Sequence, residues 1–369
     1  MADTGTEAGA LLRWIAFYLP QYHPVPENDR WWGEGFTDWR KVAEARPRHR
    51  RQLQPQLPAD LGFYDPRLAA TRDAQADLAR QYGIHGFCYY HYWFHGRRLL
   101  QEVVDQVLAS GQPDFPFCLC WANENWTRTW DGGDREVLVE QTYSEADDLN
   151  HIRWLIQVFR DPRYIRVGGR PLLLVYRAGR LPAASRTAAL WRSECARAGM
   201  DEPYLCQVDA LMAGRDDPAR NGFDAAVEFQ PDWARTGPLQ LSRSRQFLRR
   251  LGIARDHDDR VFEYAGLVEA AIAAEQPPYK KFRCVAPGWD NTARRQRSAH
   301  IFLGSTPDLY REWVSQTQRT FRPYSENENL AFVNAWNEWA EGAHLEPCQT
   351  WGRAYLEAHS SGTGHHRWN

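Results

Sequence analysis

The amino-acid sequence predicts an α/β protein, a (β/α)8 or TIM barrel with long loops at the carboxyl ends of its strands. Eight short apolar runs are spread along the 369 residues. Most are separated from the next run by a helical pattern, which is the arrangement of parallel strands joined by crossover helices. Nearly every run ends in aromatic and polar residues, and sites on this fold are built at that end. The length fits either one large barrel or two ordinary domains and does not decide between them. With the eight runs we expect a single barrel domain over residues 1–369, with flexible tails at 1–12 and 360–369.

The eight runs are interpreted as buried strands because they are short, mostly apolar and bounded by turn residues or polar segments. In chain order they are residues 14–19, 84–90, 115–121, 171–176, 204–208, 224–229, 282–286 and 330–335. A doubly wound open sheet is the alternative arrangement. Neither G-x-G-x-x-G after an early strand nor G-x-x-x-x-G-K-[ST] occurs in the chain, so a nucleotide-binding loop is unsupported.

Helix signals lie between the runs. Asp65 followed by Pro66 predicts a helix start, and the pattern continues to residue 82. Residues 99–108 carry an i, i+3, i+4 apolar stripe, Ser144 with Asp147 resembles a capping box, and residues 307–320 form another helix. After the last run only residues 352–358 look helical, which makes the final helix short. Residues 234–260 are basic and poorly patterned, and we interpret them as an insertion.

Charge and cysteine content exclude several classes of function. The chain has 45 Lys and Arg against 47 Asp and Glu, a net charge of -2, so neither nucleic acid nor an anionic membrane surface is expected as a partner. The N-terminal residues lack a signal-peptide pattern and no stretch is apolar enough to span a bilayer, so we expect a cytoplasmic protein, or a piece of a larger one, without membrane insertion. The seven cysteines are scattered, which predicts buried thiols rather than disulfides.

Tryptophan is unusually frequent, with 17 residues beside 16 Tyr and 16 Phe. Many of these tryptophans fall at or just after the ends of the apolar runs. Aromatic faces flanked by polar groups suit sugar rings, whose C–H faces are apolar and whose hydroxyls need hydrogen-bond partners. The alternative is that the rings pack the loops together. We predict that Trp121, Trp126 and Trp339 line a sugar groove.

Two carboxylates follow the eighth run in the sequence W-N-E-W-A-E-G. Glu338 and Glu341 lie three residues apart, next to Trp336 and Trp339. Such a pair can divide acid and base work, because an apolar neighbourhood disfavours the ionised form of one carboxylate while the other keeps its charge. The alternative is a pair of solvated loop acids. A second polar cluster surrounds Glu124, which we expect to bind substrate hydroxyls and not to donate the proton.

Several motifs together resemble the glycoside hydrolase family 99-like proteins, and within them the WbsX-type proteins of bacterial polysaccharide gene clusters. The motifs are N-E-W-A-E-G at 337–342, Y-L-P-Q-Y-H at 18–23, W-W-G-E-G-F-T-D-W at 31–39, G-F-C-Y-Y-H-Y-W-F at 86–94, W-A-N-E-N-W at 121–126 and G-R-A-Y-L-E-A at 352–358. They cover most of the chain, and their combination is more specific than any single motif.

The resemblance implies a barrel glycosidase that cleaves mannose or deoxy-mannose type linkages within a polysaccharide, with retention. It implies that Glu338 is the base that activates the sugar 2-hydroxyl and that Glu341 is the acid and later base. Family 99 enzymes have His where this chain has Ala340. The motifs and strand ends give these expected substrate-binding residues: Tyr18, Gln21, His23, Trp39, Tyr90, His91, Trp93, Trp121, Asn123, Glu124, Trp126, Trp289, Trp336, Asn337 and Trp339.

The alternative function is a glycosyltransferase or sugar-binding protein of surface-polysaccharide (O-antigen type) biosynthesis. A transferase that uses a nucleotide sugar often holds a metal on an Asp-x-Asp motif, and none stands at the end of a predicted strand. Asp256, His257 and Asp258 fit that pattern, but they lie in the polar insertion, where a solvated loop is the simpler interpretation. We therefore expect no metal and no cofactor, and a substrate that is an oligosaccharide or polysaccharide.

Overall fold

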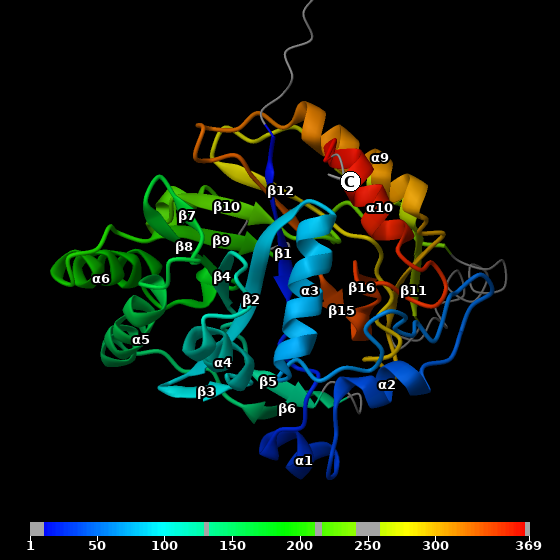
Figure 1. Cartoon of the computed structure of the whole chain (residues 1–369), viewed down its shortest axis with the longest axis horizontal. Coiled ribbons are helices and arrows are strands. Elements are labelled where there is room, and N and C mark those ends of the chain that lie inside the picture. Colours follow the sequence, from blue (N-terminus) through cyan, green and yellow to red (C-terminus); the bar gives the residue numbers. More distant parts are fainter. Residues whose placement is uncertain (1–10, 129–132, 211–215, 241–258, 366–369) are drawn as a thin grey trace, which may run out of the picture.

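Eight parallel strands form a closed barrel in the computed structural model, which describes residues 11–128, 133–210, 216–240 and 259–365 (Figure 1). The strands are β1 (Arg13–Tyr18), β2 (Ile84–Phe94), β4 (Phe117–Trp121), β8 (Arg170–Val175), β9 (Tyr204–Asp209), β10 (Ala225–Glu228), β12 (Lys281–Val285) and β14 (Leu330–Val333). Each strand pairs with the next one in chain order, and β1 pairs with both β2 and β14 to close the ring. All eight predicted strands are confirmed.

The strands form a barrel because they are mostly apolar and are covered on both faces. Every residue of β4, β9 and β14 is buried. Side chains of alternate residues fill the barrel interior, and the remaining ones face a surrounding layer of helices. The helices of that layer are α3 (Ala69–Gln81), α4 (Glu102–Ser110), α5 (Glu145–Phe159), α6 (Ala184–Arg197), α8 (Tyr264–Ile272), α9 (Pro307–Thr320) and α10 (Ala354–Thr363).

Helix boundaries test the predicted start signals. Ser144 accepts a hydrogen bond from the backbone N–H of Asp147 at 3.1 Å and begins α5 as predicted. Helix α3 starts at Ala69 and not at Asp65, because the Asp65 carboxylate accepts from the backbone N–H of Arg67 and forms a turn ahead of the helix. The expected helix from residue 99 starts later for a similar reason, since residues 97–99 pair with β2 as β3 (Arg97–Leu99).

The last helix is longer than the sequence pattern predicts. Helix α10 continues to Thr363, so the tail expected from residue 360 begins with four helical residues. Gly362 allows this helix to pack closely on α9, since a Cβ there would lie 2.9 Å from Val314. The two helices lie side by side at the upper right of Figure 1.

Several short elements lie outside the barrel and its helices, and most were not predicted. They are α1 (Pro26–Trp32), α2 (Asp38–Glu44), β5 (Trp126–Arg128), β6 (Gly133–Val139), β7 (Arg166–Val167), β11 (Arg260–Glu263), β13 (His300–Leu303), β15 (Asn337–Glu338) and β16 (Ala343–His344), with 3-10 turns at Ala178–Arg180, Pro218–Asn221 and Trp339–Glu341. Strands β11 and β13 form a separate parallel pair. Residues 241–258 of the expected insertion, including Asp256, His257 and Asp258, lie outside the described residues.

The loops at the carboxyl ends of the strands are the long ones. Helices α1 and α2 follow β1, strand β3 follows β2, and strands β5 and β6 follow β4; in Figure 1 they gather at the lower edge of the molecule. This is the face on which barrel sites are formed. The seven cysteines are free and buried, as predicted. No helix among the described residues has the length and apolar character needed to cross a membrane.

Candidate active site

A short hairpin after β14 presents both predicted carboxylates. Strands β15 and β16 pair antiparallel, and the turn between them places Glu338 and Glu341 at the mouth of the barrel. Gly342 completes the turn with φ 61°, a conformation that favours glycine. A Cβ at Gly342 would also lie 2.9 Å from the Gln56 amide nitrogen, so this position has no space for a side chain.

One guanidinium joins the two glutamates. Arg294 Nη1 lies 3.1 Å from Glu341 Oε1, and Arg294 Nη2 lies 3.3 Å from Glu338 Oε2. The same Nη2 lies 3.9 Å from Asp38 Oδ2. Three carboxylates therefore surround one cation at the carboxyl face of the barrel.

Burial of this cluster changes its proton affinities. Glu338 is 4% exposed, and burial raises its pKa to about 8, with Arg294 opposing the rise and Glu341 and Asp38 adding to it. Burial likewise raises the pKa of Asp38 to about 6. Among the described residues one guanidinium pairs with these three largely buried acids, so the cluster favours holding at least one proton.

The backbone on both sides of Glu338 is fixed by buried hydrogen bonds. The Asn337 side chain accepts from the Leu19 N–H at 2.8 Å and donates to the Leu19 carbonyl at 3.1 Å. Tyr22 donates to the Asn337 carbonyl and accepts from the Trp339 N–H. The Trp339 indole donates to Glu346 Oε2 at 2.8 Å. The end of β1 thus holds Glu338 in place before any ligand arrives.

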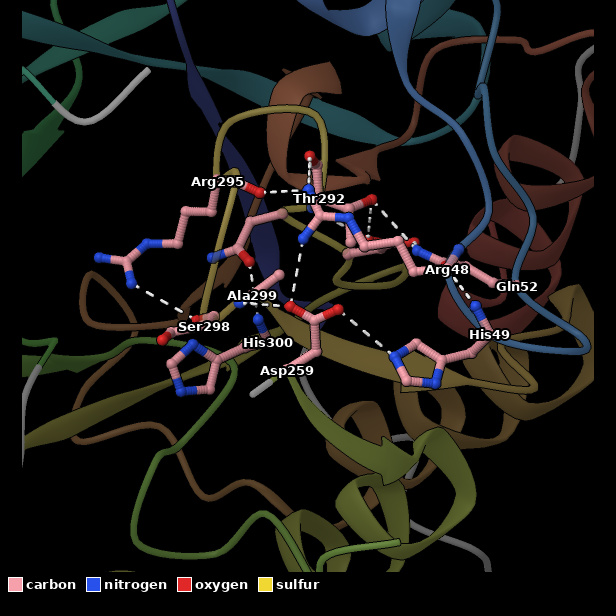
Figure 2. Close-up of polar contacts among 11 residues, drawn as sticks. Arg48, His49, Gln52, Asp259, Thr292, Arg295, Ser298, Ala299 and His300 are labelled. Carbon is pink, nitrogen blue, oxygen red and sulfur yellow. Dashed lines mark hydrogen bonds and ion pairs between the residues drawn. The ribbon is translucent and has the colours of Figure 1, made fainter. Parts of the chain in front are cut away.

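A second network holds the segment that carries Arg294. Figure 2 shows Arg48, from the long loop after β1, donating to the carbonyls of Thr292 and Arg295 at 3.1 and 2.5 Å. The same arginine forms an ion pair with Asp259 at 3.1 Å, and Asp259 in turn accepts from the Ala299 N–H at 3.0 Å. Backbone on either side of Arg294 is therefore tied to the loop after β1.

The acidic cluster opens into a cleft of about 600 Å³. Aromatic rings from α1, β2 and β5 also line the cleft, and there Trp126 packs edge to face with Trp31 at 6.0 Å and with Tyr92 at 5.3 Å. Tyr90 and Tyr176 line the cleft as well. Aromatic faces and carboxylates in one cleft suit the apolar face and the hydroxyls of a sugar.

Six of the residues that the sequence assigned to the site line the cleft. They are the two predicted catalytic residues, Glu338 and Glu341, and four of the expected substrate-binding residues, Gln21, Tyr90, Glu124 and Trp126. Glu124 forms an ion pair with Arg177 at 2.6 Å, with a third of its side chain exposed. The roles of these residues in binding stay predictions.

The other expected substrate-binding residues do not line the cleft. They are Tyr18, His23, Trp39, His91, Trp93, Trp121, Asn123, Trp289, Trp336, Asn337 and Trp339, all of which are buried. The expectation that Trp121 and Trp339 line the groove is therefore wrong for this structure. Each indole donates its N–H inside the protein, to the Trp93 carbonyl and to Glu346 respectively.

Strand alternation explains part of this difference. Successive side chains of β2 point to opposite sides, so Tyr90 and Tyr92 face the cleft, while His91 and Trp93 face α5. There His91 Nε2 contacts His151 Nε2 at 3.0 Å, and Trp93 donates to Asp147 at 3.0 Å. The period of two starting at Tyr90 could have identified Tyr92 from the sequence.

The sequence interpretation also missed Asp38 and Arg294. Asp38 lies in the W-W-G-E-G-F-T-D-W motif beside Trp39, and a buried carboxylate in an aromatic loop was an available signal. Arg294 follows β12 in a polar segment without any pattern that separates it from the other surface arginines. Among the described residues, no group of three His, Cys, Asp or Glu side chains has an arrangement that could hold a metal ion.

The chain resembles known proteins in both sequence and structure. Uncharacterized proteins named WxcX from two strains of Xanthomonas campestris pv. campestris are each 45% identical over 348 residues, which are 93% of this chain and 48% of the relative. The chain therefore spans about half the length of the curated relatives it matches.

Two solved structures share the barrel. A glycoside hydrolase-like protein has a TM-score of 0.59 at 14% identity, over 98% of this chain and 97% of that chain. The GH99 endo-alpha-mannosidase from Bacteroides thetaiotaomicron has a TM-score of 0.57 at 13% identity, over 95% of this chain and 96% of that chain. At these identities the likeness establishes the fold alone.

The sequence model of one family, described as glycosyltransferase WbsX, matches residues 14–359. This match begins in β1, ends in α10 and contains the whole cleft with its acidic cluster. The chain belongs to the WbsX family.

Proposed function

We propose that this protein hydrolyses α-mannoside-like linkages, of mannose or deoxy-mannose type, within a bacterial polysaccharide. The observation that supports this most is the pairing of Glu338 and Glu341 on Arg294, in a cleft that aromatic rings also line. Two carboxylates supply the acid and the base that glycoside hydrolysis needs. The resemblance to family 99 supports the sugar class and the retaining course.

In this proposal Glu338 takes the proton of the sugar 2-hydroxyl, and the 2-oxygen displaces the leaving group at the anomeric carbon. Glu341 gives its proton to the departing oxygen. Glu341 then takes a proton from the water that opens the 1,2-anhydro ring at the anomeric carbon, and Glu338 returns its proton to the 2-oxygen. Two inversions retain the anomeric configuration, and neither glutamate forms a bond to the sugar.

The environment of Glu338 affects its role as a base. Burial raises its pKa to about 8, so in the free protein it carries a proton for much of the time at neutral pH. A higher pKa makes the ionised carboxylate a stronger base toward a weakly acidic hydroxyl. Arg294 offsets part of the rise, because its positive charge at 3.3 Å favours the ionised form.

The roles of the two glutamates are tested most directly by comparing substrates whose leaving groups differ in acidity. Glu341→Gln should nearly abolish cleavage of natural linkages but retain much of the first step with a strongly acidic phenol leaving group, because such a group departs without a proton. Glu338→Gln should slow both substrate types alike. Glu269→Gln, at an exposed position on α8, is the matched control.

Two outcomes would contradict different parts of this proposal. A glycosyl ester trapped on Glu338 would replace the 2-hydroxyl route by an ordinary retaining mechanism while leaving the site in place. Full activity in both glutamate variants would remove the site itself.

Glycosyl transfer is the second candidate, and the description of the family favours it. The same cleft would then pass a sugar to an acceptor hydroxyl instead of water. A sugar-binding protein would keep the aromatic rings of the cleft without needing the paired glutamates. Separate incubations with a nucleotide-sugar panel and with a panel of bacterial polysaccharides distinguish these functions, since only a hydrolase shortens the polysaccharide without a donor.

A further inference from the structure

A third carboxylate, Asp38, lines the cleft and has no role in the proposed acid and base steps. Asp38 is 3% exposed and lies at the first position of α2. Its Oδ2 atom accepts a hydrogen bond from the Gln21 amide and lies 3.9 Å from Arg294. Both Asp38 and Gln21 line the cleft.

The Asp38 side chain does not stabilise its own helix through a hydrogen bond. A carboxylate at a helix start often accepts from the first free backbone N–H groups. Among the described residues, Asp38 accepts only from Gln21, and its Oδ1 atom accepts no hydrogen bond. Burying a carboxylate is unfavourable unless its oxygens find donors. The structure therefore leaves Oδ1 available to a donor that comes from the cleft.

Asp38 also lies next to the reacting pair. The same Arg294 nitrogen contacts Asp38 at 3.9 Å and Glu338 at 3.3 Å, so the two carboxylates flank one atom. A sugar ring placed with one hydroxyl at Glu338 has further hydroxyls within reach of Asp38. A carboxylate accepts hydrogen bonds and repels anions, which makes a neutral hydroxyl the matching group.

We propose that Asp38, oriented by Gln21, accepts a hydrogen bond from a second hydroxyl of the sugar ring that reacts at Glu338, and so selects sugars that carry this hydroxyl. This inference rests on the proposed hydrolase function and specifies its substrate further. A site built to bond a hydroxyl rejects the analogue that lacks it, because the buried acceptor is then left without a partner.

The contact between Asp38 and the sugar hydroxyl can be tested by combining the Asp38→Ala variant with substrates that lack single hydroxyls. The probes are dinitrophenyl α-mannoside, whose single ring is the reacting one, and its 3-, 4- and 6-deoxy counterparts. Removing the matching hydroxyl should lower kcat/KM of the wild type roughly 10- to 100-fold, the range for a hydrogen bond to a charged group. Asp38→Ala should lose a similar factor on the parent probe and nothing more on the matching deoxy probe.

Two further variants separate specificity from damage to the fold. Gln21→Ala should lower the preference for the same hydroxyl in part, because Asp38 stays present but is less well oriented. Asp73→Asn, at an exposed position on α3, should leave every ratio unchanged. The thermal midpoint of each variant shows whether a loss of activity reflects unfolding.

The possible outcomes distinguish this inference from the function on which it rests. Equal losses for Asp38→Ala on all four probes would overturn the hydroxyl contact while the hydrolase function stands. Full activity of Glu338→Gln and Glu341→Gln would overturn the hydrolase function. A wild-type protein that neither binds nor cleaves any probe would overturn both.

Discussion

The same dipeptide, Asn-Glu, follows both β4 and β14, at residues 123–124 and 337–338. The two asparagines make equivalent contacts, whereas the two glutamates have different surroundings. At β14 the Asn337 side chain bonds both backbone groups of Leu19, and at β4 the Asn123 side chain bonds both backbone groups of Arg177, at 2.7 and 3.0 Å. Each asparagine thus fixes the backbone just after a neighbouring strand, β1 in the case of Asn337 and β8 in the case of Asn123. The asparagines have equivalent roles in the fold.

The glutamates that follow are not equivalent. Glu338 is buried and shares Arg294 with two other carboxylates, whereas Glu124 is partly exposed and has Arg177 as its ion-pair partner at 2.6 Å. The same dipeptide therefore places a buried glutamate with a raised pKa, Glu338, after β14, and a partly exposed glutamate in an ion pair, Glu124, after β4. Burial and the number of neighbouring charges decide the chemistry of each glutamate, and the local motif does not.

The largest expected difference between the segments after β14 and β4 is in the turnover rate of variants at Glu338 and Glu124. Glu338→Gln should lower kcat by about 1,000-fold, within the range for loss of a general base, while Glu124→Gln should lower kcat/KM by only about 10-fold through weaker binding. Steady-state kinetics on one polysaccharide substrate measure both. Equal losses at the two positions would show that the two segments have the same function.

The pH dependence of kcat/KM should give the next largest difference between Glu338 and Glu124. On a dinitrophenyl substrate, whose leaving group needs no proton from Glu341, a base role requires ionised Glu338, so kcat/KM should fall about tenfold per pH unit below about 8 and level off above that value. Glu124→Gln should leave this limb unchanged. A rate that instead falls as the pH rises through 8 would mean that Glu338 acts in its protonated form, which would exchange the roles of Glu338 and Glu341.

The two asparagines should have similar effects on stability. Asn337→Ala leaves the buried backbone N–H and carbonyl of Leu19 without their partner, and Asn123→Ala does the same to the part-buried backbone groups of Arg177. Each group left without a bond should cost about 1 to 3 kcal/mol. Urea denaturation of the two variants gives the comparison. Only Asn337→Ala should also slow turnover in the folded protein, because it loosens the backbone beside Glu338. Unequal shifts in the urea midpoint would contradict the equivalence of the two asparagines.

The smallest effect is expected at the partly exposed ion pair of Glu124 and Arg177. Arg177→Ala removes the partner of Glu124 but should change the free energy of unfolding by less than about 1 kcal/mol, since partly solvated pairs contribute little. Calorimetry measures this change. A larger loss, with Glu124→Gln having the same effect, would show that the pair stabilises the end of β4 more than its exposure suggests.

The eight strands were predictable because each is a short apolar run closed by turn residues, and burial on both faces requires such a run. Glu338 and Glu341 were predictable for a related reason, since carboxylates at the end of a buried strand stand out against it. The β11–β13 pair was not, because its strands lie outside the barrel alternation and pair with each other across a long separation in the chain.

The orientation of the tryptophans was the least predictable feature. A strand end shows that a ring is near the carboxyl face but not whether it points to the cleft or to the helix layer. Trp126 faces the cleft, while Trp121, five residues earlier, is enclosed by His151 and Trp191. Arg294 was equally hidden, because its place beside Glu338 depends on contacts made by Arg48 and Asp259.

The ring of strands closes where the beginning of the chain meets its end, with Arg13 paired to Leu330. During synthesis at about 5 to 20 residues per second, one edge of β1 therefore waits roughly 15 to 60 s for its partner. An apolar strand with an open edge is a template for pairing with other chains. The nascent protein thus depends on whatever shields β1 during that interval, and slowing translation between β12 and β14 should raise the aggregated fraction without changing any residue.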